Sequence, residues 1–569
     1  MEDNTADKTS IYERERREKR EKIREMGLDP YGQRTEGVQP LKEIRALYQA
    51  EMGHDGGPVV KGAGRVMLKR DMGKLSFLTL RDETGDLQVA FDKKRLTEQN
   101  WAVNALIDLG DLLLVEGKLG VTNKGEVTIW ATAMSVASKA LLPPPAKWEG
   151  LSDVELRYRQ RYVDLWANPD VMRVMKLRMQ IVQEIRSFMA ARGFLEVETP
   201  MMQPIAGGAA AKPFKTHHNA LDIPLFLRIA PELYLKRLLV GGFNKVFELN
   251  RNFRNEGISP RHNPEFTMLE AYEAFGSWET MAELVESMIC TIAEKLFGTL
   301  RIEHKNAAGE VMKTINLEGD TSKPNGQRWR RVSIVELVQQ SFQTEFNGRT
   351  PLQEADPQLF EAISHERINE VRALLARELR SFERIRPMIE IDLEGPSKER
   401  AKLIADFRAD LAMLNKQMSN EGLRQGSAAR VAALTPAEQL VELYEKLIEP
   451  TLIDPCFVTH IPSVIIPLAK KNQADPFFAD VYELAINGQE ISPGYTELND
   501  PDVQAANFAE QVGDKEEQQK VDEDFLTALQ YGMPPAGGLG LGIDRLVMML
   551  TGAESIRDVI LFPLMRPQG

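Results

Sequence analysis

The stretch FELNRNFRNEG (residues 247–257), followed by RHNPEFT (261–267), carries the strongest structural signal in this chain of 569 residues. Its outer parts alternate like strands, and its middle is a Gly- and Pro-bearing loop rich in Arg, Glu, His and aromatic residues. Two antiparallel strands joined by this loop would surround one small volume with cations, a carboxylate and an aromatic ring. Arg suits phosphate oxygens and a ring suits a purine, so we expect a nucleoside triphosphate site. The alternative is a solvated charged loop.

The strand that leaves this loop continues the same site. Residues 266–272 (FTMLEAY) alternate, which puts four side chains on one face: Phe266, Met268, Glu270 and Tyr272. A carboxylate and a phenol are poor core residues unless their polar atoms are satisfied. We therefore expect this face to extend the binding surface that the loop begins.

An Asn-Gly pair joins residues 481–486 (VYELAI) to 489–491 (QEI), which is a strong hairpin signal. A two-residue loop pairs Ala485 with Glu490, so Glu483 would lie diagonal to Glu490 on the same face, roughly 7–8 Å away. Two such carboxylates repel each other unless a cation lies between them, and Mg²⁺ that also binds phosphates is the natural candidate. The alternative is two exposed glutamates on an edge hairpin.

The residues after this hairpin suggest a site for an amine. We expect Ser492-Pro493-Gly494 to break the second strand. Tyr495 and Glu497 follow on one shared face, where an aromatic wall lies beside an anion. That pair suits an alkylammonium group, with its stem along the ring and its charge on the carboxylate.

A glycine-rich run, GGLGLGIDR (537–545), leads into an apolar helix at 546–550. Its glycines permit close approach of the backbone, and Arg545 can hold a terminal phosphate. The glycine spacing matches neither a dinucleotide-binding fingerprint nor a P-loop. The nucleotide site therefore belongs to a different design.

Composition limits the classes open to this chain. It is 43% hydrophobic and 27% charged with a net charge of −13, which describes a globular protein of several domains that is no general polyanion binder. Its two cysteines, Cys290 and Cys456, form neither a disulfide framework nor a zinc motif. No apolar run approaches the roughly 20 residues that a membrane span requires. We expect a cytoplasmic location.

The first third of the chain reads as a helical extension (1–56) and a β-barrel (57–145). Residues 11–24 form either a helix with i,i+4 charge pairs or an auxiliary nucleic-acid contact. Five strand-like runs with a helix (94–109) after the third suit an OB-fold, which often binds single-stranded nucleic acid; these runs are 59–68, 75–81, 86–91, 111–119 and 126–137. Phe77 and Gln88 lie on adjacent strand candidates, and Glu126 opens the last strand. An aromatic ring with these two polar groups suits a flipped base, although Phe77 alone would more often be core.

A triple proline at 143–145 marks a domain boundary, and a polar linker (146–168) follows it. Residues 171–192 repeat apolar positions with helical spacing, and Gly193 suits the position that ends a helix. We expect a strand at 194–199, stopped by Pro200. Within the last domain (169–569), residues 343–440 are highly charged and read as a helical insertion without assignable chemistry.

Taken together, these segments resemble the class II lysyl-tRNA synthetases of bacterial type. GFLEVETP resembles motif 1 of that class, FRNEGISPRHNPEFTMLE resembles motif 2, and GLGLGIDR resembles motif 3. The segments HHNALDIPLFLRIAPELYLKRLLVGGF and ISPGYTELND are similar to the lysyl branch in particular. The likeness covers nearly the whole chain apart from most of 343–440.

This resemblance implies an α+β fold: an N-terminal OB-fold barrel for the anticodon, and a catalytic domain built on an antiparallel sheet flanked by helices. It also implies a homodimer formed through motif 1. The substrates would be L-lysine, ATP with Mg²⁺, and tRNA(Lys), and the reaction would proceed through lysyl-adenylate. No membrane is involved.

The resemblance also implies roles for individual residues. Arg254 would bind the α-phosphate and the lysine carboxylate, while Arg545 and His262 would hold the outer phosphates. Glu256 would bind the adenine amino group, and Phe266 would stack on its ring. The remaining roles are lysine binding by Glu232, Glu270, Tyr272, Tyr495 and Glu497, Mg²⁺ binding by Glu483 and Glu490, and anticodon binding by Phe77, Gln88 and Glu126.

The chain departs from the family pattern in two places. Members usually have Asn where this chain has Pro493, and that amide contacts the substrate carboxylate. The segment 462–469 (PSVIIPLA) also lacks the Glu and Ser that usually precede Pro-Leu. The alternative functions are a catalytically silent paralog or a synthetase that uses a lysine analogue.

Overall fold

In this computed structural model, the described residues are 3–144, 151, 153–209, 211–306, 308–337, 437, 440, 441, 444–511 and 521–567. The predicted insertion at 343–440 lies outside them apart from Ala437 and Leu440. The chain divides into two compact units, residues 1–176 with 561–569, and residues 177–560. The boundaries that the sequence suggests at 57, 146 and 169 stay predictions.

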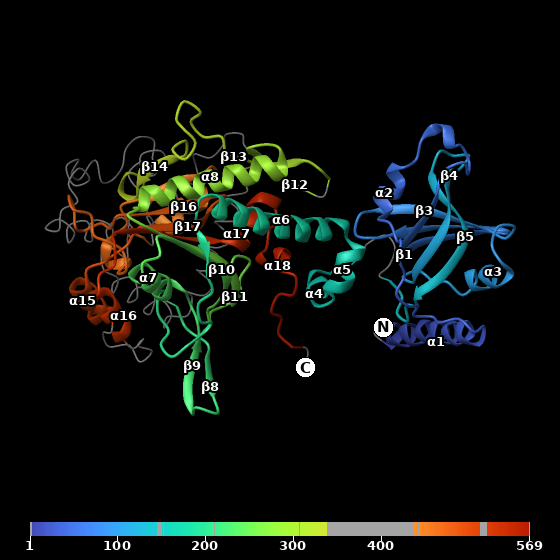
Figure 1. The fold of residues 1–569 in the computed structure, drawn as a ribbon, viewed down its shortest axis with the longest axis horizontal. Helices are drawn as coiled ribbons and strands as arrows, with labels where there is room; N and C mark the ends of the chain where they lie inside the picture. Colours follow the sequence, from blue (N-terminus) through green and yellow to red (C-terminus); the bar gives the residue numbers. More distant parts are fainter. Residues whose placement is uncertain are drawn as a thin grey trace, which may run out of the picture. The chain divides into compact units, whose positions relative to one another are not determined.

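The first unit contains a closed five-stranded barrel, which confirms the predicted OB-fold (Figure 1). Its strand order is β1-β2-β3-β5-β4. The short helix α3, Glu98–Asn104, follows the third strand as expected, and Thr97 caps it by accepting a hydrogen bond from the Asn100 backbone N–H. The strands are β1 (Val59–Met72), β2 (Leu75–Arg81), β3 (Asp86–Asp92), β4 (Leu112–Val121) and β5 (Val127–Ser138).

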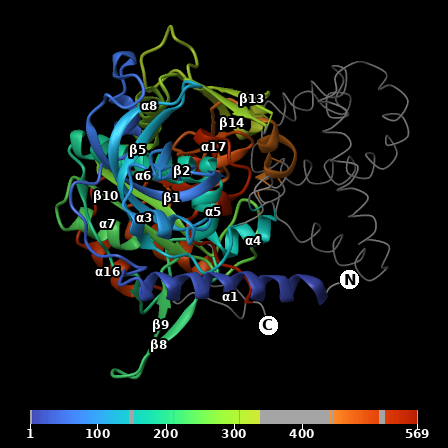
Figure 2. The ribbon, with the colours of Figure 1, turned by 90° about the vertical axis from the view of Figure 1, so that its right-hand side faces the viewer.

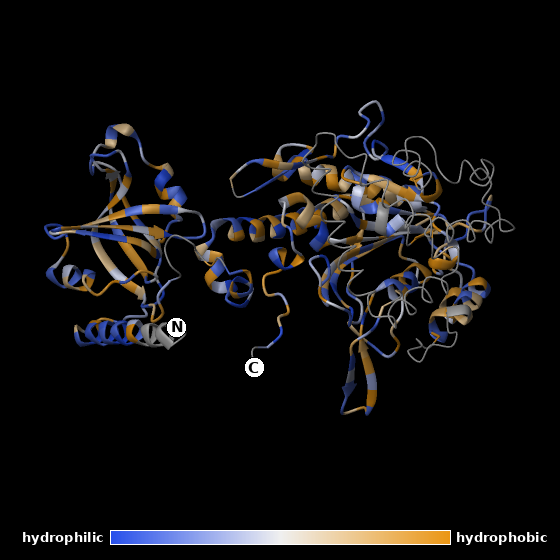
Figure 3. Cartoon of the chain, turned by 180° about the vertical axis from the view of Figure 1, so that it is seen from behind, coloured by the Kyte–Doolittle hydropathy of each residue, from blue (hydrophilic) through white to orange (hydrophobic). Residues whose placement is uncertain are grey.

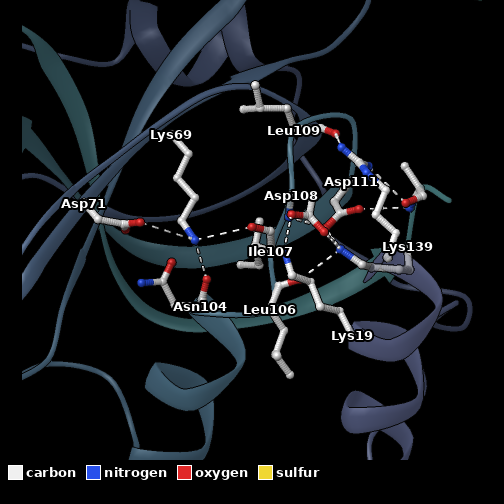
Figure 4. A network of polar contacts seen from close by, with 12 residues as sticks. Lys19, Lys69, Asp71, Asn104, Leu106, Ile107, Asp108, Leu109, Asp111 and Lys139 are labelled. Carbon is white, nitrogen blue, oxygen red and sulfur yellow. Dashed lines mark hydrogen bonds and ion pairs between the residues drawn. The ribbon is translucent and has the colours of Figure 1, made fainter. Parts of the chain in front are cut away.

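The N-terminal helix α1, Asp3–Glu25, runs as one straight helix in Figures 1 and 2 and is mostly hydrophilic in Figure 3. The predicted i,i+4 charge pairs include Arg17 with Glu13 at 2.5 Å. Its Ile23 side chain belongs to the barrel core. An ion pair of 2.5 Å between Lys19 and Asp108 ties the helix to the barrel unit (Figure 4). Asp108 also pairs with buried Lys139, which pairs with Asp111 as well, at 2.7 Å each.

The second unit is built on an eight-stranded sheet of order β14-β15-β16-β17-β18-β11-β10-β6. All neighbours are antiparallel except β14 with β15 and β6 with β10. Helix α8 (Trp278–Phe297) packs against β17 and β18 (Figure 1). The strands are β6 (Leu195–Glu196), β10 (Lys245–Phe253), β11 (Glu265–Ala274), β14 (Arg330–Ser333), β15 (Cys456–Thr459), β16 (Val481–Ile486), β17 (Gln489–Thr496) and β18 (Ala536–Gly542).

Smaller elements complete the two units. A three-stranded sheet consists of β7 (Met202–Gln203), β9 (Ile223–Leu227) and β8 (Lys215–His218), and a two-stranded one of β12 (Arg301–Lys305) and β13 (Val311–Asn316). The other helices are α2 (Leu41–Ala46), α4 (Val154–Arg159), α5 (Arg161–Ala167), α6 (Pro169–Ala191), α7 (Glu232–Val240), α15 (Pro501–Gln511), α16 (Glu523–Gln530), α17 (Ile543–Thr551) and α18 (Ile556–Val559). Among the described helices, none is long and apolar enough to cross a membrane.

Two expectations about local structure need correction. Helix α6 ends as predicted before Gly193, whose φ is +80°, but the strand expected at 194–199 is only the two-residue β6. The break expected at 492–494 is absent, because β17 runs through Pro493. Pairing of β17 with β18 begins only at Gly494, so the missing N–H of Pro493 interrupts no bond on that side.

Candidate functional site

Alternate glycines of β18 form the floor of the candidate site. Gly538 and Gly540 project no side chain onto this face, while Leu539 and Leu541 are buried on the opposite face. A Cβ atom on Gly538 would lie 2.7 Å from Cε1 of Tyr272, and one on Gly540 would lie 3.1 Å from Cε of Met268. These glycines therefore keep the middle of the sheet open while side chains from neighbouring strands close over it.

Strand β11 provides one wall, and its register confirms that the four predicted side chains share a face. Tyr272 pairs with Gly538 of β18, and Glu270 pairs with Glu248 of β10. The Glu270 side chain is buried; its carboxylate accepts hydrogen bonds from Asn252 Nδ2 at 3.4 Å and from the Tyr272 hydroxyl at 3.5 Å. Burial is the main reason that the pKa of Glu270 rises to about 8.

Where β11 begins, the Arg254 guanidinium carbon lies 5.1 Å from the centroid of the Phe266 ring. The Arg254 backbone N–H donates to Pro264 O at 2.8 Å, which closes the loop between β10 and β11. Arg254 Nε is buried and lacks a hydrogen-bond partner. A buried N–H without an acceptor fits a site that an anionic group completes. Glu256 lies in this loop and is exposed.

The phosphate end joins three chain segments. His262 Nε2 lies 3.2 Å from Arg545 Nη2, and its Nδ1 lies 2.8 Å from Ser259 Oγ. Burial, followed by the nearby Arg545 charge, lowers the pKa of His262. Arg545 Nη1 also donates to the backbone O of Glu490 at 2.7 Å. The loop, the helix after β18 and strand β17 thus meet here.

The two glutamates of the hairpin lie close to a third carboxylate. The predicted pairing of Ala485 with Glu490 is confirmed, but a bulge then pairs Glu483 with Pro493. The two carboxylates still influence each other. Burial is the main reason that the pKa of Glu483 rises well above its usual range, and the negative charges of Glu490 and Glu449 raise this pKa further. The Glu449 carboxylate accepts a hydrogen bond from the Glu490 backbone N–H. Glu449 was not predicted.

Mutual repulsion among these carboxylates fits a site for a divalent cation. Glu490 Oε2 lies 3.7 Å from Arg545 Nη1, so phosphates held by Arg545 could complete the coordination. No group of three or more His, Cys, Asp or Glu side chains in the described part of the chain is arranged to hold a metal alone. A site that needs phosphate oxygens as further ligands agrees with that finding.

The amine end is strongly anionic and buried. Glu497 is 1% exposed, and burial raises its pKa to about 7 although neighbouring Lys236 opposes the rise. Its Oε1 has no hydrogen-bond partner and lies where a Cβ of Gly538 would be. Burial and then the charges of Glu490 and Glu232 raise the pKa of Tyr495, which pairs with Gly538 of β18.

Lys236 of α7 is a pocket residue that the sequence analysis missed. Its Nζ lies 2.7 Å from Glu232 Oε1 and 2.5 Å from Glu497 Oε2. The i,i+4 spacing from Glu232 is a signal that could have identified this pair. The pairing with Glu497 joins residues 261 positions apart and has no such signal.

Phe266, Arg545 and Glu497 therefore border one face of one sheet rather than separate surfaces. Phe266 lies at the start of β11, Arg545 follows β18 directly, and Glu497 follows β17. The sheet order β17-β18-β11 makes these strands neighbours. The site can accept a ligand with phosphates and a flat ring at one end and an amine at the other.

The barrel brings two of the three predicted base-binding residues, Phe77 and Gln88, to one face. Phe77 pairs with Ala90 and lies diagonal to Gln88. Gln88 is oriented by Arg70, which donates to its Oε1 at 3.3 Å, and by Thr128 Oγ1, which accepts from its Nε2 at 2.8 Å. Glu126 precedes β5 and pairs with Arg45 at 3.3 Å. The ring centroid of buried Trp130 lies 6.3 Å from that of Phe77 and 3.9 Å from that of His54, a contact that was not predicted.

Comparison with known proteins adds independent findings. The family described as tRNA synthetases class II (D, K and N) matches residues 153–566, and the OB-fold nucleic acid binding domain matches residues 60–137. The lysine–tRNA ligase of Carboxydothermus hydrogenoformans is 42% identical over 557 residues, covering 97% of each chain. The lysine–tRNA ligase of Bacillus subtilis is 40% identical over 558 residues, covering 97% of this chain and 96% of the relative.

Proposed function

This chain belongs to the class II lysine–tRNA ligases, and on that premise we propose that it activates L-lysine with ATP and transfers the lysyl group to the 3′ end of tRNA(Lys). The observation that carries the choice of lysine is the buried, unpartnered Oε1 of Glu497. An ammonium group would satisfy this oxygen, whereas a substrate with an acidic side chain would be repelled by it. Aspartate is therefore excluded as the cognate amino acid.

At the other end of the pocket, Phe266 stacks on the adenine ring, and Glu256 accepts a hydrogen bond from the adenine amino group. Arg254 binds the α-phosphate and the lysine carboxylate, while His262 and Arg545 bind the outer phosphates. The partnerless Nε of Arg254 and the 3.2 Å approach of His262 to Arg545 support these roles. Cations that converge on phosphate oxygens stabilise charge that moves during phosphoryl and adenylyl transfer.

Lysine binds along the anionic end of the site. The Glu232 carboxylate accepts a hydrogen bond from the α-ammonium group, and Glu270 lies nearby. Tyr272 and Glu497 accept hydrogen bonds from the ε-ammonium group, and the Tyr495 ring lies along the aliphatic stem. Glu483 and Glu490 hold Mg²⁺ together with phosphate oxygens. The ion, when bound, neutralises part of the triphosphate charge.

In this reaction the protein accelerates catalysis mainly by positioning the lysine carboxylate against the α-phosphate. The lysine carboxylate attacks the α-phosphorus in line, the bond to the β-phosphate oxygen breaks, and lysyl-adenylate and pyrophosphate form. Arg254 can hold the attacking carboxylate and the α-phosphate at the same time. The 3′ hydroxyl of the terminal ribose of tRNA then attacks the acyl carbon and releases AMP. No side-chain base is assigned to the second step.

The barrel binds the anticodon through Phe77, Gln88 and Glu126, and a homodimer forms through α6 and β6. Exposed apolar side chains support that surface, since Met179 of α6 is 55% and Leu195 of β6 is 56% exposed. We also propose a cytoplasmic location. The free, buried thiols of Cys290 and Cys456 fit a reducing compartment.

ATP–pyrophosphate exchange measured with each of the twenty amino acids tests this proposal. We expect exchange with lysine, and at most weak exchange with aspartate or asparagine. Absence of exchange with lysine at high enzyme concentration would favour the catalytically silent alternative. Faster exchange with another amino acid would overturn the lysine assignment.

A further inference from the structure

The ammonium group of Lys236 lies buried beneath the amine end of the pocket, with its side chain 0% exposed. Nζ donates hydrogen bonds to Glu232 Oε1 at 2.7 Å and to the backbone O of Leu468 at 3.2 Å. It also pairs with Glu497 Oε2 at 2.5 Å. Nζ thus makes two hydrogen bonds and one ion pair, all three with groups of the protein. Lys236 is therefore satisfied within the protein and needs no ligand.

The two carboxylate oxygens of Glu497 face different surroundings. Oε2 contacts Lys236 Nζ as an ion pair, without the angle of a good hydrogen bond. Oε1 has no partner and lies against the backbone of Gly538, on the open face of the sheet. The interaction with Lys236 therefore constrains the carboxylate and leaves one oxygen for another cation.

The charges of the occupied pocket balance only if Lys236 is included. Three carboxylates line the amine end: Glu232, Glu270 and Glu497. Bound lysine brings two ammonium groups, and its own carboxylate pairs with Arg254. Lys236 supplies the third positive charge. Without it, a buried carboxylate would have to take up a proton or move, because an unpaired charge in a dry site is costly.

We propose that Lys236 is a positioning residue for the amino-acid substrate, holding the carboxylates of Glu232 and Glu497 in the arrangement that receives the two ammonium groups of lysine. It does so through one oxygen of each carboxylate and does not touch the substrate. This inference rests on the proposed function, which assigns both carboxylates to lysine.

The variant Lys236→Gln tests the proposal in the full-length protein by ATP–pyrophosphate exchange. Glutamine retains hydrogen-bond donors and loses the charge. We expect KM for lysine to rise about tenfold or more while KM for ATP stays within about twofold of its original value. A purely structural role would lower kcat through a smaller active fraction and leave both KM values unchanged, and that result would overturn the proposal.

Lys139→Gln is the matched control, because Lys139 is also 0% exposed and pairs with two carboxylates, but in the barrel. We expect this control to lower thermal stability without raising KM for lysine. An equal rise in KM for lysine in both variants would mean that lost stability, rather than lost positioning, weakens lysine binding. That result would also overturn the proposal.

A measurement on the unmodified protein covers the case in which Lys236→Gln does not fold. Amine-selective acylation followed by peptide mass spectrometry should leave Lys236 unmodified with and without saturating lysine, while exposed Lys42 reacts in both states. Acylation of Lys236 in the presence of lysine would show that substrate displaces it, which contradicts the proposal.

Failure of the proposed function can be distinguished from failure of this inference. If the unmodified protein does not activate lysine, the proposed function is wrong. An unchanged KM for lysine in Lys236→Gln refutes only the positioning role of Lys236.

Discussion

Gly538 and Glu497 share one space in the pocket, because a Cβ atom on Gly538 would coincide with the Glu497 carboxylate. The substitution Gly538→Ala must therefore push Glu497 or Tyr272 aside. Overpacking of this kind costs about 1–3 kcal/mol, which corresponds to a loss of roughly 5- to 150-fold in kcat/KM for lysine. ATP–pyrophosphate exchange under limiting lysine measures the loss.

Gly542→Ala is the control for this prediction. It lies on the same strand, and its new Cβ would meet no atom closer than 3.6 Å, which is an ordinary contact. We expect it to retain most of the lysine dependence of the original protein. If Gly542→Ala lost as much as Gly538→Ala, general disturbance of β18 would explain both results and the steric account would be wrong.

Glu497→Gln should weaken lysine binding much more than ATP binding. Truncating one partner of a buried charge pair costs about 2–5 kcal/mol, so we expect KM for lysine to rise by roughly 30-fold or more. KM for ATP should change little, because Glu497 lies at the amine end of the pocket. Steady-state exchange with each substrate varied in turn would separate these effects, and equal losses in both would contradict the role of Glu497.

The titration of Glu270 predicts that lysine binding depends on pH. Burial raises the pKa of this carboxyl from 4.5 to about 8, so the ligand-free protein carries it protonated at neutral pH. The α-ammonium of lysine favours the ionised form, so binding should release a proton, and affinity should improve as pH rises from about 6 to 8. Calorimetry in two buffers of different ionisation enthalpy measures that release.

Glu270→Gln supplies the comparison for the pH prediction, since its lysine binding should depend less on pH over that range, with the remainder coming from Glu497, whose pKa is about 7. The same shift affects stability with a definite sign. The folded state holds a proton that the unfolded state releases above about pH 4.5, so the contribution of Glu270 to stability declines as pH rises toward 8. Proton release that is equal in both proteins would exclude Glu270 as the source.

Pro493 is the position where the family usually has an amide, and it faces the glycine floor. Its Cγ would lie 3.6 Å from a Cβ on Gly540. Pro493→Asn should restore a hydrogen bond to the substrate carboxylate, worth about 0.5–1.5 kcal/mol, and so lower KM for lysine by roughly 2- to 12-fold. An unchanged or higher KM in the exchange assay would show that this chain holds the carboxylate in another way.

Phe77→Ala should separate the two halves of the reaction. Stacking of a base on an aromatic ring contributes about 1–3 kcal/mol, so KM for tRNA in aminoacylation should rise by roughly 5- to 150-fold. Exchange of pyrophosphate needs no tRNA and should stay unchanged. An unchanged KM for tRNA would show that the anticodon contacts lie elsewhere on the barrel.

Local patterns predicted much of this fold. Alternation identified the barrel strands and the shared face of Phe266 and Tyr272, and the Asn-Gly pair identified the hairpin. The bulge after Glu490 was not predictable, because one extra residue leaves the alternation nearly unchanged. The continuity of β17 through Pro493 was not predictable either, because it depends on where pairing with β18 begins.

The site was predictable where its residues lie in motifs and not where distant segments meet. Lys236 with Glu497, and Glu449 with Glu490, are contacts that only the folded sheet creates. Trp130 reads as a core residue in a barrel strand, and the structure agrees, because its side chain is buried; its packing against the rings of His54 and Phe77 is a contact that only the folded barrel creates.

A crystal structure with a non-hydrolysable lysyl-adenylate analogue tests the central claim most directly, namely that one pocket binds the nucleotide and the amine together. We expect the purine to stack on Phe266 and the ε-nitrogen to lie within hydrogen-bond distance of Glu497 Oε1. If the amine instead pointed away from Glu497, or the purine lay on a different face of the sheet, the account would be wrong.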